Sequence, residues 1–177
     1  WSLGGVFARF PRLKLVLTEQ SCGWVPGVLA MLDHQYRRFA DPRTAESHFG
    51  GALLQSVPEP PSAYWARNCW AGASFLRPPE AALRHEIGVD RMAFGQDFPH
   101  WEGTWPHTGQ WLQDAFRGVP EGELDAVLAG NAIAFYDLPA DRLREVGARI
   151  GLPRVGVFGD HPVDPELTVD VPGYIPD

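Results

Sequence analysis

The sequence predicts an α/β domain built around a parallel β-sheet. Three short segments have the apolar character of buried strands, at residues 13–19, 69–75 and 91–97. A segment with apolar residues at helical spacing follows each of them. Because strand–helix units that alternate in this way join parallel strands, we expect one sheet, with chemistry at the end where its strands lead into loops.

The first strand and its helix have a clear pattern. Residues 13–19 are almost continuously apolar, which is typical of a strand covered on both faces. Pro26 then opens a helix at a position where the missing N–H is not needed. One apolar stripe follows at helical spacing, made of Val25, Leu29, Leu32 and Tyr36. Residues 40–61 are rich in Pro, Gly and Ser and predict a long loop, either a lid or an insertion.

The later elements repeat this order. Two prolines at positions 78 and 79 begin a helix that ends at Gly88, a natural residue just beyond a helix. Further helices are predicted over 107–117, 121–136 and 141–150. Asn131 lies on the apolar stripe of the helix 121–136, so it needs hydrogen-bond partners if it is buried. We interpret it as a structural pin for the loop of the third strand.

Length and composition limit the classes of protein to which this chain can belong. The chain has 177 residues, of which 45% are hydrophobic, enough for one domain. Residues 1–152 are expected to form it, and 153–177, with five prolines, an irregular tail. A net charge of -7 argues against nucleic acid as a partner, because phosphate binding needs a basic stripe. No apolar run approaches the roughly 18 residues of a membrane span, so a membrane partner is not expected.

The two cysteines, Cys22 and Cys69, are not spaced as metal ligands. So few thiols fit a reduced, cytoplasmic protein. Cys22 follows a strand end, but no nucleophile elbow or histidine partner accompanies it, so a buried and inert thiol is expected.

Asp97, at the end of the third strand, is the residue most strongly indicated for chemistry. By strand alternation Ala93, Gly95 and Asp97 share one face. Two small residues leave space and a carboxylate closes the row, as a ligand site at the rim of a barrel requires. Alternatively, Asp97 caps the following loop through an Asx-turn. The neighbouring His100 and Glu102 favour the site.

Several segments resemble, in the same order, those of a known enzyme family. The clearest is GQDFPH at 95–100, followed by Glu102 and Gly103. It is similar to the last-strand motif of the amidohydrolase-related barrel enzymes, in the branch of the aminocarboxymuconate semialdehyde decarboxylases. The others are GVFARFPRLKLVL at 5–17, SAYWARN at 62–68 and GNA at 130–132. The resemblance covers the sixth to eighth strands of the family's barrel.

This resemblance implies a partial (β/α)8 barrel of the TIM type, made of the last three strands with their helices. It implies a metal-dependent hydrolase or decarboxylase that acts on a small organic substrate, and it allows a homo-oligomer. Asp97 would bind the divalent metal, with zinc expected, and would transfer protons. The family's other ligands, a His-x-His pair and a further histidine, have no counterpart here. The chain is therefore expected to be part of an enzyme and inactive alone.

Other candidate residues lie beside the predicted strand ends. Where many relatives have a histidine, this chain has Glu19, either a second catalytic carboxylate or a structural one bonded to backbone or to an arginine such as Arg67. His100, Trp101 and Trp105 are candidates for substrate binding, because tryptophans can line an apolar pocket. The alternative for these three is a solvated histidine and rings that pack their own loop.

A function of another class also fits, namely a non-catalytic scaffold or interaction fragment made from an incomplete barrel. A His-x-His motif encoded upstream of Trp1 would support the enzyme, whereas a start codon there would support the scaffold.

Overall fold

Three parallel strands form the sheet at the centre of the computed structural model, which describes residues 2–150. They are β1 (Leu15–Thr18), β2 (Cys69–Ser74) and β3 (Met92–Gly95), in the order β1-β2-β3. Leu15 pairs with Cys69, and Ala71 pairs with Met92. The predicted α/β class and parallel order are confirmed, although each strand is shorter than its predicted segment. The tail predicted at 153–177 lies outside the described residues.

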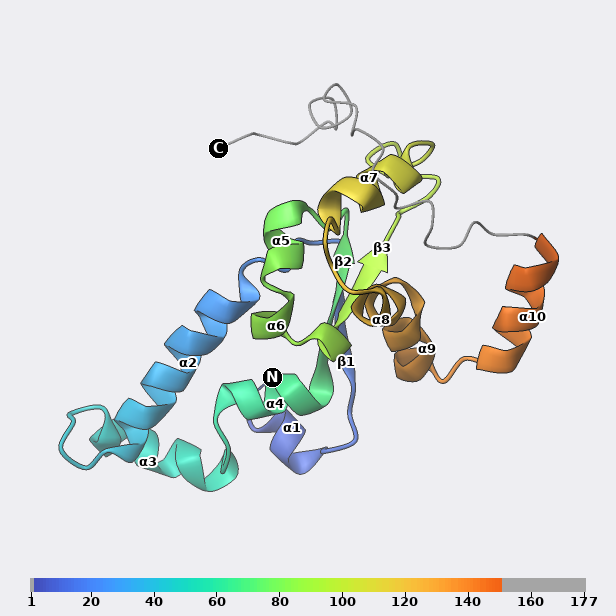
Figure 1. Ribbon diagram of the computed structural model, residues 1–177. Coiled ribbons are helices and arrows are strands. Elements are labelled where there is room, and N and C mark those ends of the chain that lie inside the picture. Colours follow the sequence, from blue (N-terminus) through green and yellow to red (C-terminus); the bar gives the residue numbers. More distant parts are fainter. Residues whose placement is uncertain (1, 151–177) are drawn as a thin grey trace.

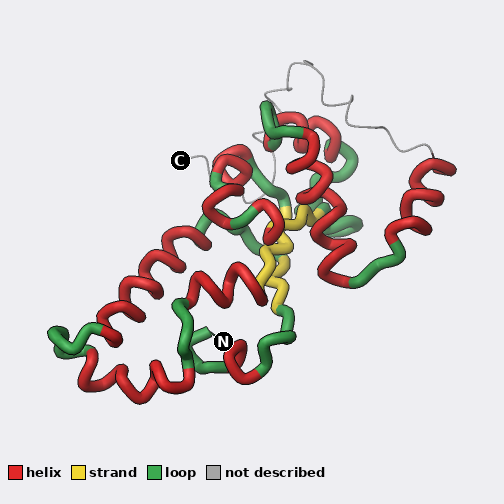
Figure 2. The backbone as a smooth tube through the Cα atoms, turned by 60° about the horizontal axis from the view of Figure 1, so that its bottom comes forward, coloured by secondary structure: helices red, strands yellow, loops and turns green. Residues whose placement is uncertain are grey.

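Helices make up much of the rest of the described chain, and several of them lie beside the sheet (Figure 1). They are α1 (Val6–Arg9), α2 (Val25–Ala40), α3 (Ser47–Ser56), α4 (Pro61–Asn68), α5 (Pro78–Ala82), α6 (Arg84–Ile87), α7 (Thr108–Ala115), α8 (Glu121–Asp125), α9 (Asn131–Tyr136) and α10 (Ala140–Ile150). Figures 1 and 2 show α2 extending away from the sheet with α3 at its far end, and α10 set apart from the other helices.

The core lies on one face of the sheet. In β2, side chains alternate between buried and partly exposed: Cys69, Ala71 and Ala73 are buried, and the residues between them are not. The buried set packs into a cluster with large side chains from the helices and loops, among them Phe7, Tyr64, Leu76 and Ile87. Burying one such side chain contributes about 1.5–3 kcal/mol. The opposite face carries little of this core and is left free for a site.

Two buried asparagines fix the starts of the outer strands. Asn68 Nδ2 donates to two backbone carbonyls just before β1, at 3.0 and 2.7 Å. Asn131 Nδ2 donates to the carbonyls of Val89 and Met92, both at 2.7 Å. Leaving such buried groups without a partner costs about 1–3 kcal/mol each. The structural role predicted for Asn131 is therefore supported, but it holds the start of β3 and not the loop beyond it.

The loop predicted over 40–61 contains a helix, α3, which the sequence interpretation missed. Glycine in this segment serves close packing: a Cβ atom added to Gly50 would lie 2.3 Å from the Phe39 side chain on α2. The absence of a side chain lets the two helices approach each other. A composition rich in Gly and Ser was thus mistaken for a sign of irregular chain.

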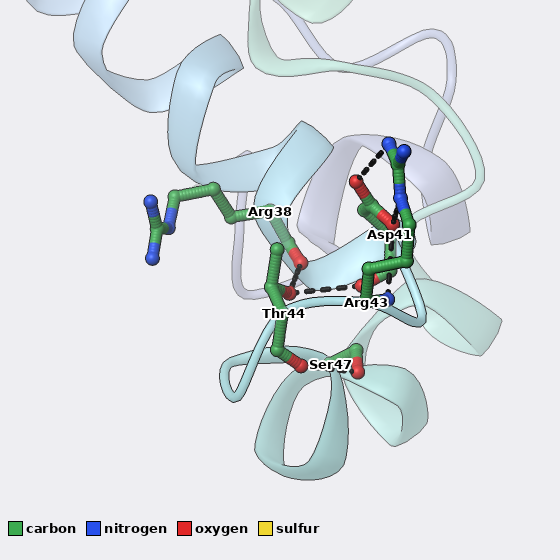
Figure 3. A network of polar contacts seen from close by, with 5 residues as sticks. All are labelled: Arg38, Asp41, Arg43, Thr44 and Ser47. Atoms are coloured by element: carbon green, nitrogen blue, oxygen red, sulfur yellow. Dashed lines mark hydrogen bonds and ion pairs between the residues drawn. The ribbon is translucent and has the colours of Figure 1, made fainter.

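Polar contacts close the turn between α2 and α3 (Figure 3). The Thr44 hydroxyl lies within hydrogen-bonding distance of the carbonyls of Arg38 and Asp41. The Asp41 carboxylate accepts two hydrogen bonds from the Arg43 guanidinium, at 2.9 and 2.7 Å. These bonds hold the pKa of Asp41 below its ordinary value. All of these contacts join residues within the turn itself, and none of them reaches the sheet.

The other predicted helices are observed, two of them interrupted. The helix from Pro78 divides into α5 and α6 at Leu83, and Gly88 has a φ of 104° that suits glycine. The segment 121–136 is helical but contains a π-turn at Ala126–Gly130, between α8 and α9. Across residues 2–150, the helices are too short or too polar to cross a lipid bilayer.

Candidate functional site

A cavity of about 340 Å³, here called the hollow, lies over the open face of the sheet. All three strands contribute to its lining: Val16 and Thr18 from β1, Trp70, Gly72 and Ser74 from β2, and Ala93, Phe94 and Gly95 from β3. Residues of α9, including Asn131 and Phe135, line it as well. The hollow therefore occupies the face that the helical core leaves free.

Small residues create this space. A Cβ atom added to Gly72 would lie 3.0 Å from Thr18 Cγ2 and 3.2 Å from Val16 Cγ2. Glycine at this position therefore leaves room for these two side chains of β1. On the β3 side, Ala93 and Gly95 line the hollow and have little or no side chain to fill it. The predicted small face of the third strand thus faces a cavity.

Asp97 and Glu19 lie at the same rim of this hollow. Neither residue belongs to its strand, because β3 ends at Gly95 and β1 ends at Thr18. Both have left-handed backbone conformations, with φ of 60° for Asp97 and 56° for Glu19. The prediction that Asp97 shares a face with Ala93 and Gly95 agrees with the structure, since all three line the hollow, but β3 ends at Gly95 and the left-handed turn after it directs this carboxylate.

The surroundings of Asp97 do not match the capping alternative. The backbone carbonyl of Asp97, and not its carboxylate, accepts the His100 N–H at 2.8 Å. The carboxylate Oδ2 lies 3.4 Å from His100 Nδ1, and the Asp97 side chain is 28% exposed. Within residues 2–150, no backbone N–H donates to this carboxylate. Asp97 is thus partly enclosed, with an imidazole as its neighbour.

Glu19 is exposed at the rim, and no hydrogen bond to its carboxylate occurs in the described range. The suggested pairing with Arg67 is wrong. Arg67 binds both oxygens of Glu59, at 3.1 and 2.8 Å, and also donates to Asn68. Glu19 is therefore available to water or to a ligand.

The candidate substrate-binding residues lie in the loop beyond β3. His100 is brought next to Asp97, but none of His100, Trp101 and Trp105 lines the hollow. The tryptophans are 67% and 63% exposed, and Trp105 meets the Phe98 ring edge to face at 5.5 Å. A role in substrate binding remains a prediction for these three.

One carboxylate at this end of the sheet was missed by the sequence interpretation. Glu80 is only 7% exposed and accepts hydrogen bonds from the backbone N–H groups of Cys22 and Gly23. The one signal available was its position as the third residue of a helix that begins with two prolines, where a glutamate often caps the helix. Nothing local indicated that it also reaches a loop almost sixty residues earlier.

Both cysteines are buried and free. Burial, together with the neighbouring Glu80 carboxylate, raises the pKa of Cys22 to about 12. Burial raises the pKa of Cys69 to about 11. A thiolate is the reactive form of cysteine, so these pKa values agree with the expected inert thiols.

The described residues do not by themselves make a metal site. They contain no group of three or more His, Cys, Asp and Glu side chains placed to hold an ion. Asp97 and Glu19 offer two carboxylates at one rim, short of the three protein ligands that a catalytic zinc uses. What the pair can do alone is bind a cation loosely or exchange protons with a molecule in the hollow.

A protein-family model with the description amidohydrolase matches residues 1–138. The match includes all three strands, the rim carboxylates and α9, and it ends before α10. No curated protein matches the chain.

Proposed function

The chain belongs to the amidohydrolase family, and from this premise we propose that it contributes one wall of the active site of a hydrolase or decarboxylase for small organic substrates. The observation that carries the proposal is the convergence of Asp97 and Glu19 on one rim of the hollow, above a floor of small side chains. Active sites of parallel barrels lie at this end of the sheet. The partial (β/α)8 barrel is part of the same proposal.

Asp97 is the proposed proton-transfer residue. It is the more enclosed of the two carboxylates, and it has His100 beside it. Its carboxylate can accept a proton from a substrate or water in the hollow and return it to a leaving group. We also propose that it supplies one ligand to a divalent metal, with zinc as the expected ion. The remaining ligands would lie outside the described residues.

Glu19 is the proposed second carboxylate, and Glu19→Gln tests it. The amide keeps the size of the side chain but cannot accept a proton as a base, so we expect turnover of the active enzyme to fall by roughly 10²-fold, at the lower end of acid–base contributions. Glu86→Gln, at an exposed position of α6 and outside the lining of the hollow, is the matched control and should retain activity. Normal turnover in Glu19→Gln would assign Glu19 to a passive role. Normal turnover in Asp97→Asn as well would favour the scaffold alternative.

Metal binding gives a second test of the proposal. With so few ligands in the described range, we expect this chain to bind Zn²⁺, Mn²⁺ and Mg²⁺ weakly and with little discrimination. The free energy should fall far short of the roughly 10–16 kcal/mol of a structural zinc site. Equilibrium dialysis followed by elemental analysis measures it. Tight, stoichiometric zinc in the purified chain would contradict the assignment of the other ligands to residues elsewhere.

His100, Trp101 and Trp105 are proposed to contact the substrate, since their loop follows directly from Asp97. A cytoplasmic setting and a homo-oligomer are further parts of the proposal; two free, buried thiols and the open edges of the sheet support them.

A further inference from the structure

We propose that Glu80 is a positioning residue, which joins the loops after β1 and β2 and thereby holds Glu19 at the rim of the hollow. The inference rests on the proposed function, in which Glu19 is a working carboxylate. Glu80 itself does not line the hollow, so it would act through the backbone and not on the substrate.

The contacts of Glu80 reach two separate loops. Its Oε1 accepts the N–H of Cys22 at 2.6 Å and that of Gly23 at 3.3 Å, both in the loop between β1 and α2. Its Oε2 accepts the N–H of Arg77 at 3.2 Å, in the loop between β2 and α5. One buried carboxylate therefore bridges two loops, and Cys22 lies 58 residues before Glu80 in the chain.

The chemistry of this bridge requires a carboxylate. All three partners are N–H donors, and only an ionised carboxylate can accept at both of its oxygens. It also lies just before the first turn of α2, where the helix dipole favours negative charge. A glutamine could satisfy one loop, but its NH2 group would face a donor in the other. The bridge is thus specific in charge as well as in shape.

The bridge continues to both rim carboxylates. Glu19 lies three residues before Cys22, so the N–H bond at Cys22 limits how far the turn at Glu19 can move. On the other side, the Phe75 N–H donates to the Gly95 carbonyl at 3.2 Å, two residues before Asp97. Glu80 therefore joins the loop that carries Glu19 to the loop already bonded to the end of β3.

The two cysteines allow a direct test with Glu80→Gln, because each reports on a different place. Cys22 lies in the bridge, and the Glu80 charge adds to the effect of burial in raising the pKa of its thiol. Cys69, at the start of β2, is also buried, but Glu80 is not among the causes of its raised pKa. Loss of the charge lowers the pKa of Cys22 and frees its loop, so more thiolate forms and meets reagent.

We expect Glu80→Gln to increase the rate at which a small thiol reagent modifies Cys22 about tenfold at pH 8, because the loss of a charge-assisted hydrogen bond lets the loop that carries this thiol open more often. Cys69 should change by less than about twofold, and Glu86→Gln, an exposed glutamate of α6, should change neither rate. An unchanged rate at Cys22 would overturn the proposal. An equal acceleration of both thiols would also overturn it, because that is the signature of general loosening.

If Glu80→Gln does not fold, hydrogen exchange of the unmodified chain decides the matter. The amides of Cys22, Gly23 and Arg77 should exchange slowly as a group, and more slowly than those of Gln20 and Ser21. Fast exchange at Cys22 and Gly23 would show that the bridge is not kept in solution.

Turnover separates this inference from the proposed function. In the active enzyme, Glu80→Gln should lower kcat by about tenfold with a smaller change in KM, as expected when a catalytic group is displaced. If the thiol results hold but Glu19→Gln is fully active, the bridge stands and the role of Glu19 fails. If Glu19→Gln is impaired but Cys22 does not respond to Glu80→Gln, the bridge fails and the function stands.

Discussion

In the active enzyme, replacing Asp97 by asparagine is expected to lower turnover by about 10²–10⁴-fold, the range that a positioned acid–base group contributes. Near neutral pH the amide can neither take up a proton nor serve as an anionic ligand. The fold should hardly change, because asparagine adopts the left-handed conformation readily and Asp97 has a φ of 60°. The contact between Asp97 Oδ2 and His100 Nδ1 is long at 3.4 Å, so changing it should alter the stability of the fold only slightly. Steady-state kinetics and a denaturant titration measure the two effects.

Asp137→Asn is the matched control for this variant. Asp137 also has a left-handed backbone, with a φ of 53°, but it follows α9 and does not line the hollow. We expect it to retain full activity and the same stability. Near-normal turnover in Asp97→Asn would remove Asp97 from the mechanism, whatever the control shows.

Self-association of the isolated chain is the second large effect that we expect. In the described residues β1 and β3 form the two edges of the sheet, each with one side that no strand pairs. Unpaired N–H and C=O groups on such edges are templates for pairing with another chain. On the free face, residues such as Val16 stay partly exposed beside the hollow, where a closed barrel would bury them in its core. We therefore expect a stability near or below the lower end of the usual range of roughly 5–15 kcal/mol, and oligomers that grow with concentration.

Sedimentation velocity across a concentration series measures this association. Thr18→Lys places a charge on the exposed end of β1 and should shorten the oligomers, because edge lysines disfavour strand pairing. Gln55→Lys makes a similar charge change on an exposed position of α3, away from the sheet, and should leave them unchanged. A monomer with a sharp, cooperative melt would contradict the expectation and show that other parts of the chain cover the edges.

The local periodicity of the sequence was enough to establish the frame of the molecule. The apolar segments 13–19, 69–75 and 91–97 each contain an observed strand, and helices follow them as predicted. The placement of carboxylates at one rim also followed, since the ends of parallel strands meet at one edge of a sheet. These features depend on residues close together in the chain, whose side-chain pattern repeats with the geometry of a strand or a helix.

Tertiary structure alone decided which polar groups meet. The pairing of Arg67 with Glu59 and not with Glu19, and the reach of Glu80 to Cys22, depend on how separate elements pack. Such contacts leave no periodic trace in the sequence. The direction of Asp97 was likewise set by a left-handed turn that only the folded loop selects. Short-range physics thus placed Asp97 and Glu19 at the rim, whereas long-range packing determined that, within residues 2–150, Glu80 is bonded to two loops and the Glu19 carboxylate has no hydrogen bond.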